Sequence, residues 1–81
     1  MVSDKIKLIA RGIWQQAKEH NGRYLLAHRY RRPKPWEVPS GLDDKYDACQ
    51  WLASQGYAEW LSAFSSKSPG IQIRPGGKEW T

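Results

Sequence analysis

The chain has little of several residue patterns that define whole classes of protein. It contains one cysteine, Cys49, among 81 residues, which excludes the internal disulfide framework that stabilises many small secreted domains. No apolar run approaches the ~20 residues that a helix needs to cross a bilayer, and the first residues lack the apolar core of a signal peptide. We therefore expect a soluble, cytoplasmic protein without a membrane partner.

Patterns that carry catalysis or bind metal are also missing. His20 and His28 lie without the cysteine or acidic partners of a metal site, and neither C-x-x-C nor H-E-x-x-H occurs. No serine lies in a nucleophile-elbow pattern, and the pair Gly76-Gly77 does not precede a helix as a phosphate-binding loop does. We expect a protein that is not an enzyme and binds neither a metal nor another cofactor.

The chain is short but rich in aromatic residues. With 81 residues it is expected to form one domain over residues 1–81. A domain of this size buries about 60–65% of the surface that its extended chain exposes, so its core is small. The five tryptophans are most simply explained as core residues, and Cys49 is expected to be a buried thiol.

Residues 3–21 have a clear helical pattern. Ser3 can cap this helix, and the sequence His20-Asn21-Gly22 is a natural stop. Apolar residues recur at steps of three and four, the spacing of one buried helix face. This face contains Ile6, Ile9, Ala10, Ile13, Trp14 and Ala17. The other face carries Lys5, Lys7, Arg11, Gln15 and Lys18, and we expect it to be solvated.

A second helical stretch lies at residues 41–55. Ser40 and Asp43 have the spacing of a capping box, and Gly56 is a typical stop because glycine tolerates the left-handed conformation. The face toward the core is predicted to contain Leu42, Tyr46, Cys49, Leu52 and Ala53. The opposite, outward face is predicted to contain Asp44, Asp47, Ala48, Trp51 and Gln55.

Two strands are predicted after this helix. Residues 57–64 are rich in aromatic side chains, and residues 71–74 alternate strictly between apolar and polar ones. A polar loop that contains Pro69 lies between them. Two strands joined by a short loop form a hairpin, and we expect Ile73 on its inner side to be buried together with Leu52.

The stretch between the two helices has no single interpretation. Residues 23–32 fit a short helix, but Tyr24, Leu26 and Tyr30 also alternate as in a strand. Two prolines then forbid a helix, so residues 33–39 are expected to form a loop with extended backbone.

The order of these elements resembles one known family. The run from Leu52 to Leu61, LASQGYAEWL, followed by GIQIRPGG from Gly70 to Gly77, resembles the last helix and wing of winged helix-turn-helix domains. The resemblance implies a small α+β domain with three helices followed by a C-terminal β-hairpin, the wing. It also favours a helix for residues 24–31. A strand in this region that pairs with the hairpin would instead give a three-stranded wing sheet.

The basic residues favour DNA as a partner. The formal net charge is +5, which suits an anionic partner. A basic cluster with interleaved aromatic residues can neutralise phosphates. It contains Arg29, Arg31, Arg32 and Lys34.

The winged-helix resemblance adds further candidates for DNA contact. It places Lys67 at the wing tip and Arg74 on the second wing strand, where family members contact the minor groove or the DNA backbone. The helix that would read the bases carries Lys45, Gln50 and Gln55. The first hypothesis is therefore a small, non-enzymatic DNA-binding regulator or accessory protein that binds double-stranded DNA.

The predicted outward face of the helix at residues 41–55 favours a second hypothesis. Asp44 and Asp47 would be repelled by DNA phosphates, whereas an exposed Trp51 suits a protein-binding surface, where aromatic residues are enriched. Trp36 and Trp60 are further candidate anchors. The alternative is a winged-helix-like protein-interaction module or homodimer with no direct DNA role.

Overall fold

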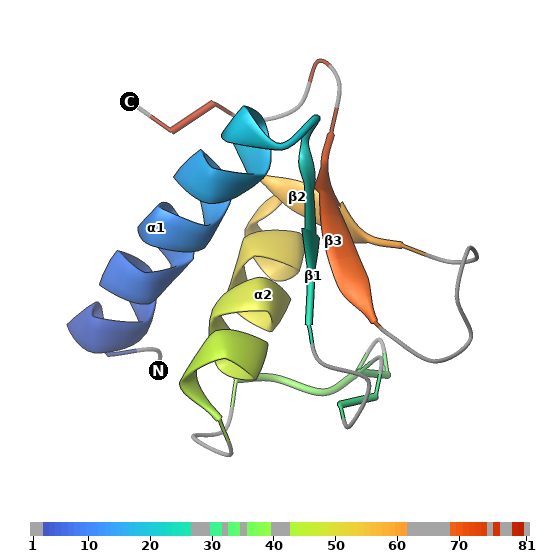
Figure 1. The fold of residues 1–81 in the computed structure, drawn as a ribbon. Helices are drawn as coiled ribbons and strands as arrows, with labels where there is room; N and C mark the ends of the chain where they lie inside the picture. Colours follow the sequence, from blue (N-terminus) through green and yellow to red (C-terminus); the bar gives the residue numbers. More distant parts are fainter. Residues whose placement is uncertain are drawn as a thin grey trace.

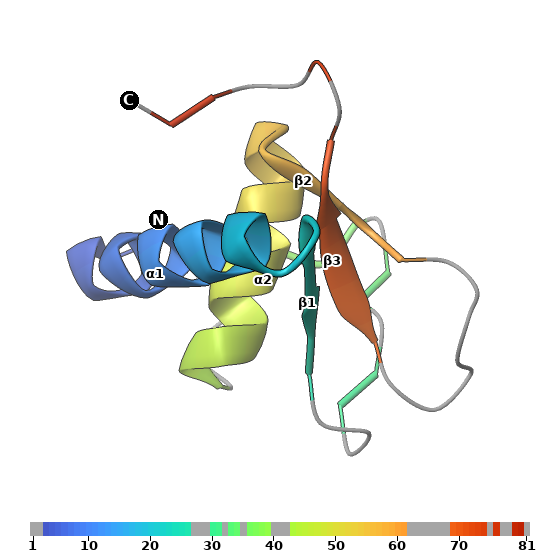
Figure 2. The same cartoon turned by 45° about the horizontal axis from the view of Figure 1, so that its top comes forward.

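The structure is a computed structural model that describes residues 3–26, 30–31, 33–34, 36–39, 43–61, 69–74, 76 and 79–80. These residues contain the helices α1 (Asp4–Glu19) and α2 (Asp44–Gln55) and the strands β1 (Arg23–Leu25), β2 (Ala58–Trp60) and β3 (Gly70–Ile73) (Figure 1). The strands form one antiparallel sheet, and both helices pack on the same face of it (Figure 2). The chain is a small α+β domain, as the sequence predicts.

Helix α1 forms as its pattern predicts. The Ser3 side chain accepts a hydrogen bond from the Ile6 N–H at 3.3 Å and caps the helix at Asp4. The apolar face is buried at Ile6, Ala10, Ile13, Trp14 and Ala17. The helix ends at Glu19, and Asn21 and Gly22 then take positive φ angles of 59° and 79° to turn the chain into the sheet.

The predicted helix over residues 24–31 is wrong at its start, because residues 23–25 form β1 instead. Tyr24 lies opposite Ile71 of β3, and the Ile73 N–H donates to the Gly22 carbonyl at 2.7 Å. The chain alternates here, so that Leu26 is buried whereas Leu25 is 62% exposed. The strand interpretation is therefore the correct one for β1. Residues 27–29 lie outside the described residues.

Helix α2 is capped by Asp43 and not by Ser40. The Asp43 carboxylate accepts hydrogen bonds from the N–H groups of Lys45 at 3.0 Å and Tyr46 at 3.2 Å, so the helix begins at Asp44 and not at residue 41. Residues 40–42 lie outside the described residues. The predicted end is confirmed, because Gly56 has a φ of 87°.

Strand β3 is the central strand of the sheet. The order is β1-β3-β2, so the predicted hairpin is present as β2 and β3, and β1 extends it to three strands. Tyr24, Ile71 and Trp60 form one row across the sheet and pack against the core beneath the helices. Residues 62–68, which include the predicted wing tip at Lys67, lie outside the described residues.

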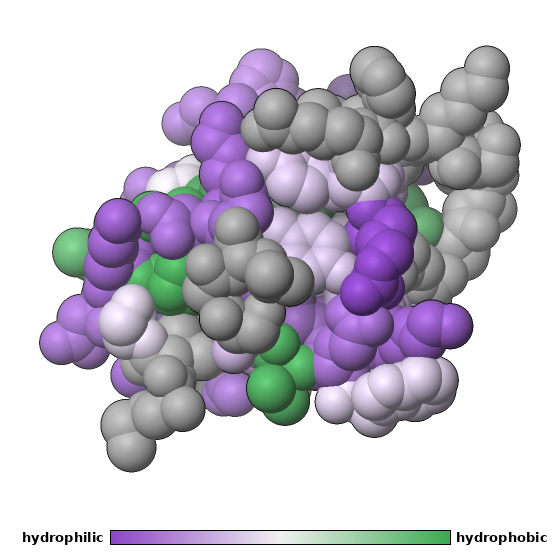
Figure 3. Space-filling model, turned by 90° about the horizontal axis from the view of Figure 1, so that it is seen from below, coloured by the Kyte–Doolittle hydropathy of each residue, from purple (hydrophilic) through white to green (hydrophobic). Residues whose placement is uncertain are grey.

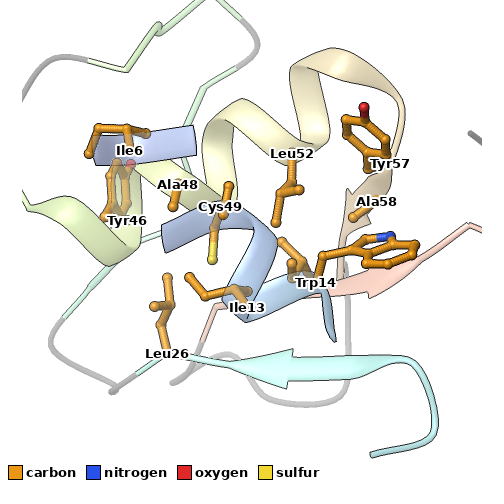
Figure 4. Packing of buried hydrophobic residues seen from close by; sticks show 12 residues of the cluster. Ile6, Ile13, Trp14, Leu26, Tyr46, Ala48, Cys49, Leu52, Tyr57 and Ala58 are labelled. Atoms are coloured by element: carbon orange, nitrogen blue, oxygen red, sulfur yellow. The ribbon is translucent and has the colours of Figure 1, made fainter. Parts of the chain in front are cut away.

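The core joins the inner sides of both helices to the centre of the sheet (Figure 4). Leu52 and Ile71 are fully buried, whereas Ile73, the predicted partner of Leu52, is only half-buried because it lies at the end of β3. The prediction that all five tryptophans are core residues is wrong. Trp14 is buried and Trp36 is 75% exposed, while Trp51, Trp60 and Trp80 are half-buried.

Candidate functional site

Helix α2 is more enclosed than its sequence predicts. Asp47 and Ala48, which were predicted to face outward, are 1% and 0% exposed. Helix α1 packs along α2, and its Lys5 ammonium lies 3.1 Å from the Asp44 carboxylate. Ile6 and Ala48 belong to the same buried cluster (Figure 4). The predicted outward face is therefore wrong at Asp47 and Ala48, and only parts of α2 remain accessible.

Gln50 connects α2 to two other parts of the chain. Its amide N–H donates to the Glu37 backbone carbonyl, and its amide oxygen accepts a hydrogen bond from the Trp60 indole N–H at 2.9 Å. The side chain is only 7% exposed. A contact from Gln50 to a DNA base would require both of these hydrogen bonds to break, which leaves buried polar groups without partners.

A groove of about 450 Å³ lies between the segment at residues 33–38 and the outer side of α2. Pro33, Lys34, Glu37 and Val38 form one wall, and α2 and β2 contribute Ala53, Ser54 and Trp60. The lining combines apolar and polar side chains, as in sites that hold a ligand by shape and fix its orientation with a few hydrogen bonds. Gln50 lies in its lining and holds Trp60 in place.

The chain segment that supplies this wall, called here the wall segment, also carries the most exposed apolar side chains among the described residues. Trp36 is 75% exposed and Val38 is 73% exposed. The Lys34 ammonium lies 5.6 Å from the centre of the Trp36 ring, and the Arg31 guanidinium lies 2.9 Å from the Glu37 carboxylate. These contacts fix the segment against its own neighbours and leave the two apolar side chains open to solvent.

Several of the described residues that were predicted to bind DNA lie near opposite ends of α2. Lys45 lies in the first turn of α2 and Gln55 in the last, which places them about 15 Å apart along the helix. Arg74 lies near the Gln55 end, since its N–H donates to the Tyr57 carbonyl, whereas Tyr30, next to Arg31, bonds Asp43 at the other end. Arg29, Arg32 and Lys67 lie outside the described residues.

Acidic groups accompany several of the basic ones. Glu37 pairs with Arg31 and raises its pKa, chiefly through the hydrogen bond between the two side chains. The Asp44 carboxylate likewise lies 3.1 Å from a cation, the Lys5 ammonium. Figure 3 shows the face at the bottom of Figure 1, which is mainly hydrophilic and has small, separate hydrophobic areas. A DNA phosphate at Arg31 would have to compete with a carboxylate already in place.

The third predicted anchor, Trp51, is half-buried and not exposed. Its ring centre lies 5.8 Å from that of Tyr57 and 5.4 Å from that of Trp80. Trp51 therefore belongs to an aromatic cluster with Tyr57 and Trp80 and does not line the groove.

Cys49 has the environment of an inert thiol. It is fully buried, and this burial raises its pKa to about 12, with a smaller contribution from the negative charge of Asp43. Within the described ranges, no group of three histidine, cysteine, aspartate or glutamate residues is arranged to hold a metal ion. Among the same residues, no helix is long and apolar enough to cross a membrane.

Comparison with known proteins gives no family assignment. No protein-family model, no curated protein and no solved structure matches the chain. The groove, the exposed wall residues and the placement of charge are thus the features from which a function can be inferred.

The groove was only partly foreseeable from sequence. Trp36 and Trp60 were predicted as anchors, and both belong to this region, one in the wall segment and one in the lining. Val38 and Ser54 were not predicted. The three prolines at 33, 35 and 39 indicate an extended segment, but nothing in the sequence indicates that this segment lies across α2.

Proposed function

We propose that the chain is a winged-helix-like protein-interaction module whose groove holds an extended peptide segment of a partner protein. The observation that carries this proposal is a groove of about 450 Å³ whose lining includes Val38, which is 73% exposed, with Trp36, two residues earlier in the chain, 75% exposed beside it. Aromatic anchors beside a pocket are typical of the residues that dominate protein–protein binding energy.

The order of elements supports the winged-helix part of the proposal. A helix that ends at Gly56 and runs directly into a hairpin is present, and β1 adds a third strand to this hairpin. One element differs from the pattern of three helices. The described residues between Leu25 and Asp43 form neither helix nor strand, and part of this segment covers α2 where a recognition helix would have to be open.

The charge distribution favours a protein partner over DNA. The accessible part of α2 near its first turn combines Lys45 with Asp43 and Asp44, and Arg31 is paired with Glu37. Phosphate binding needs cations that are free to replace condensed counterions. A mixed surface with exposed apolar residues is instead the usual composition of a protein-binding site.

The groove can be tested by peptide binding followed by NMR. We expect peptides selected from a random library against the protein to shift the signals of the Trp60 indole N–H and the Gln50 side-chain amide, because both groups lie in the lining. Val38→Ala and Trp36→Ala should each weaken the selected peptides by about tenfold or more, the loss typical of an anchor residue.

Leu8→Ala is a matched control for this test. Leu8 is 72% exposed, as Val38 is, but it lies on α1 and is not part of the groove lining. Its substitution should leave peptide affinity unchanged. Peptides that bind without shifting the Trp60 or Gln50 signals, or that are insensitive to Trp36 and Val38, would contradict the proposal.

DNA binding is a second candidate function, and the exposure of Lys34, Lys45 and Arg74 favours it. If these residues contact phosphates, affinity for a mixed-sequence duplex should fall steeply with salt. Lys45→Ala and Arg74→Ala should each flatten the salt slope by about one unit. Fluorescence anisotropy with a labelled duplex measures this, and Lys7→Ala, at an exposed position on α1, is the control. Lack of duplex binding at low salt would eliminate this candidate.

A further inference from the structure

Trp80 docks on an aromatic surface that both helices and the start of the hairpin provide. Its ring stacks on Tyr57, with 4.7 Å between ring centres and 18° between ring planes. The Trp51 ring lies 5.4 Å away and the Trp14 ring 6.2 Å away, both tilted relative to Trp80. Three aromatic rings from α1, α2 and the residue before β2 thus surround one indole.

Two cations complete this surface. The Arg11 guanidinium lies 5.5 Å from the centre of the Trp80 ring, within the range of a cation–π contact. The Lys18 ammonium lies 3.1 Å from the Glu79 carboxylate and 4.6 Å from the centre of the Trp14 ring. The surface therefore contacts an indole and, directly beside it, a carboxylate.

We propose that this surface, called here the indole site and formed by Arg11, Trp14, Lys18, Trp51 and Tyr57, binds a partner peptide in which a carboxylate residue directly precedes a tryptophan. Glu79 and Trp80 occupy the site within the chain and compete with that partner. Glu79 and Trp80 define the chemistry of the ligand, because the carboxylate pairs with the ammonium of the site and the indole contacts its aromatic rings.

The internal occupant is held in a way that allows exchange. Glu79 and Lys18 are 65% and 43% exposed, and an ion pair between such exposed groups adds little stability. Among the described residues, the backbone hydrogen bonds outside helices and strands include none from Glu79 or Trp80. Trp80 itself stays half-buried. Attachment rests mainly on one indole ring, while α1, α2 and the sheet are complete without it.

The expected effect follows from competition between a tethered and a free ligand. A ligand tethered to its site through a short stretch of chain has an effective concentration of the order of millimolar. A free peptide of the same chemistry with a dissociation constant near 0.1 mM would then bind about tenfold more weakly to the intact protein than to a variant with an open site. Trp80→Ala opens the site and should raise peptide affinity by that factor.

The test uses a capped peptide with the sequence of residues 76–81, GGKEWT, titrated into the wild-type protein and into Trp80→Ala. Binding is measured by calorimetry and by the indole N–H signals of Trp14 and Trp51. Arg11→Ala in the Trp80→Ala background should weaken binding about threefold, the loss of one exposed cation–π contact. A peptide with alanine in place of tryptophan should bind more weakly still, and a peptide with lysine in place of glutamate should lose a smaller part of its affinity, because the exposed ion pair contributes little.

Leu8→Ala is again the control variant, since Leu8 is exposed on α1 and has no part in the indole site. Glu79→Lys provides a second opening variant that keeps Trp80; it should raise peptide affinity by a smaller factor. Failure of both variants to bind the peptide at millimolar concentration would overturn the proposal. So would loss of folding in Trp80→Ala, which would make Trp80 a core residue. The proposal would also be overturned if the wild-type protein associated with itself while Trp80→Ala did not bind the peptide. That result would favour an exchange of the Glu79-Trp80 pair between copies of the chain.

Discussion

Leu52→Ala is expected to lower the free energy of unfolding by about 2–5 kcal/mol, through lost apolar burial and the cavity that remains. Leu52 is fully buried on the inner side of α2 and is among the largest fully buried side chains of the described core. In a domain with a small core, a loss of this size is a large fraction of the total stability. Urea melts of the two proteins measure the difference.

Leu25→Ala is the matched control for Leu52→Ala. Leu25 has the same side chain but is 62% exposed on β1, so its truncation should change stability by no more than about 0.5 kcal/mol. Cys49 provides an independent readout. As the one cysteine of the chain it is fully buried, and its labelling by a thiol reagent should accelerate in Leu52→Ala because the core opens more often.

A small effect of Leu52→Ala would contradict the observed packing. If the change were less than about 1 kcal/mol, with labelling of Cys49 as slow as in the wild-type protein, the inner side of α2 could not be the centre of the core. An equal loss in Leu25→Ala would point to the same conclusion.

Sequence predicted the elements whose signals are local. Ser3 and Gly56 mark real helix ends, because capping and the left-handed stop depend on neighbouring residues only. The burial of Cys49 and Leu52 follows from helical periodicity. The two strands after Gly56 are also correct, although β2 is shorter than the predicted 57–64 and β3 begins one residue before the predicted 71–74.

The errors concern features that depend on partners distant in sequence. Residues 23–25 fit a helix and a strand equally well, and their pairing with β3 decides between them. Asp47 and Ala48 were predicted to face outward but are buried, and no periodicity within α2 can indicate which other parts of the chain pack on it. Asp43 replaces Ser40 as the cap because both residues suit a helix start.

The candidate site, like the fold, was predicted from the sequence only in part. Trp36 was predicted as an anchor from its residue type, and its exposure is in keeping with that role. Gln50 was predicted to contact DNA bases, yet its amide instead joins Glu37 to Trp60. Such a bridge brings together residues from three separate segments, so neither spacing nor composition reveals it.

Gly70→Ala is expected to destabilise the protein by about 1–3 kcal/mol, the usual effect of overpacking. A Cβ atom on Gly70 would lie 2.5 Å from the Leu25 Cδ2 atom and 2.7 Å from the Tyr24 carbonyl oxygen. The leucine side chain can rotate away, but the carbonyl belongs to β1, which pairs with β3 at this point. The two strands must therefore separate locally to admit a methyl group.

The same substitution at Gly12 should have the opposite effect on stability. Gly12 lies inside α1, with no atom within 4 Å of the place that its Cβ would occupy. Gly12→Ala should therefore stabilise the protein by about 0.5–1 kcal/mol, because alanine favours the helix and restricts the unfolded chain. Urea melts of both variants give the comparison, and amide exchange at Tyr24 and Leu26 shows whether β1 has separated in Gly70→Ala. Equal stability of the two variants would mean that β1 and β3 are not in the register that places Leu25 opposite Gly70.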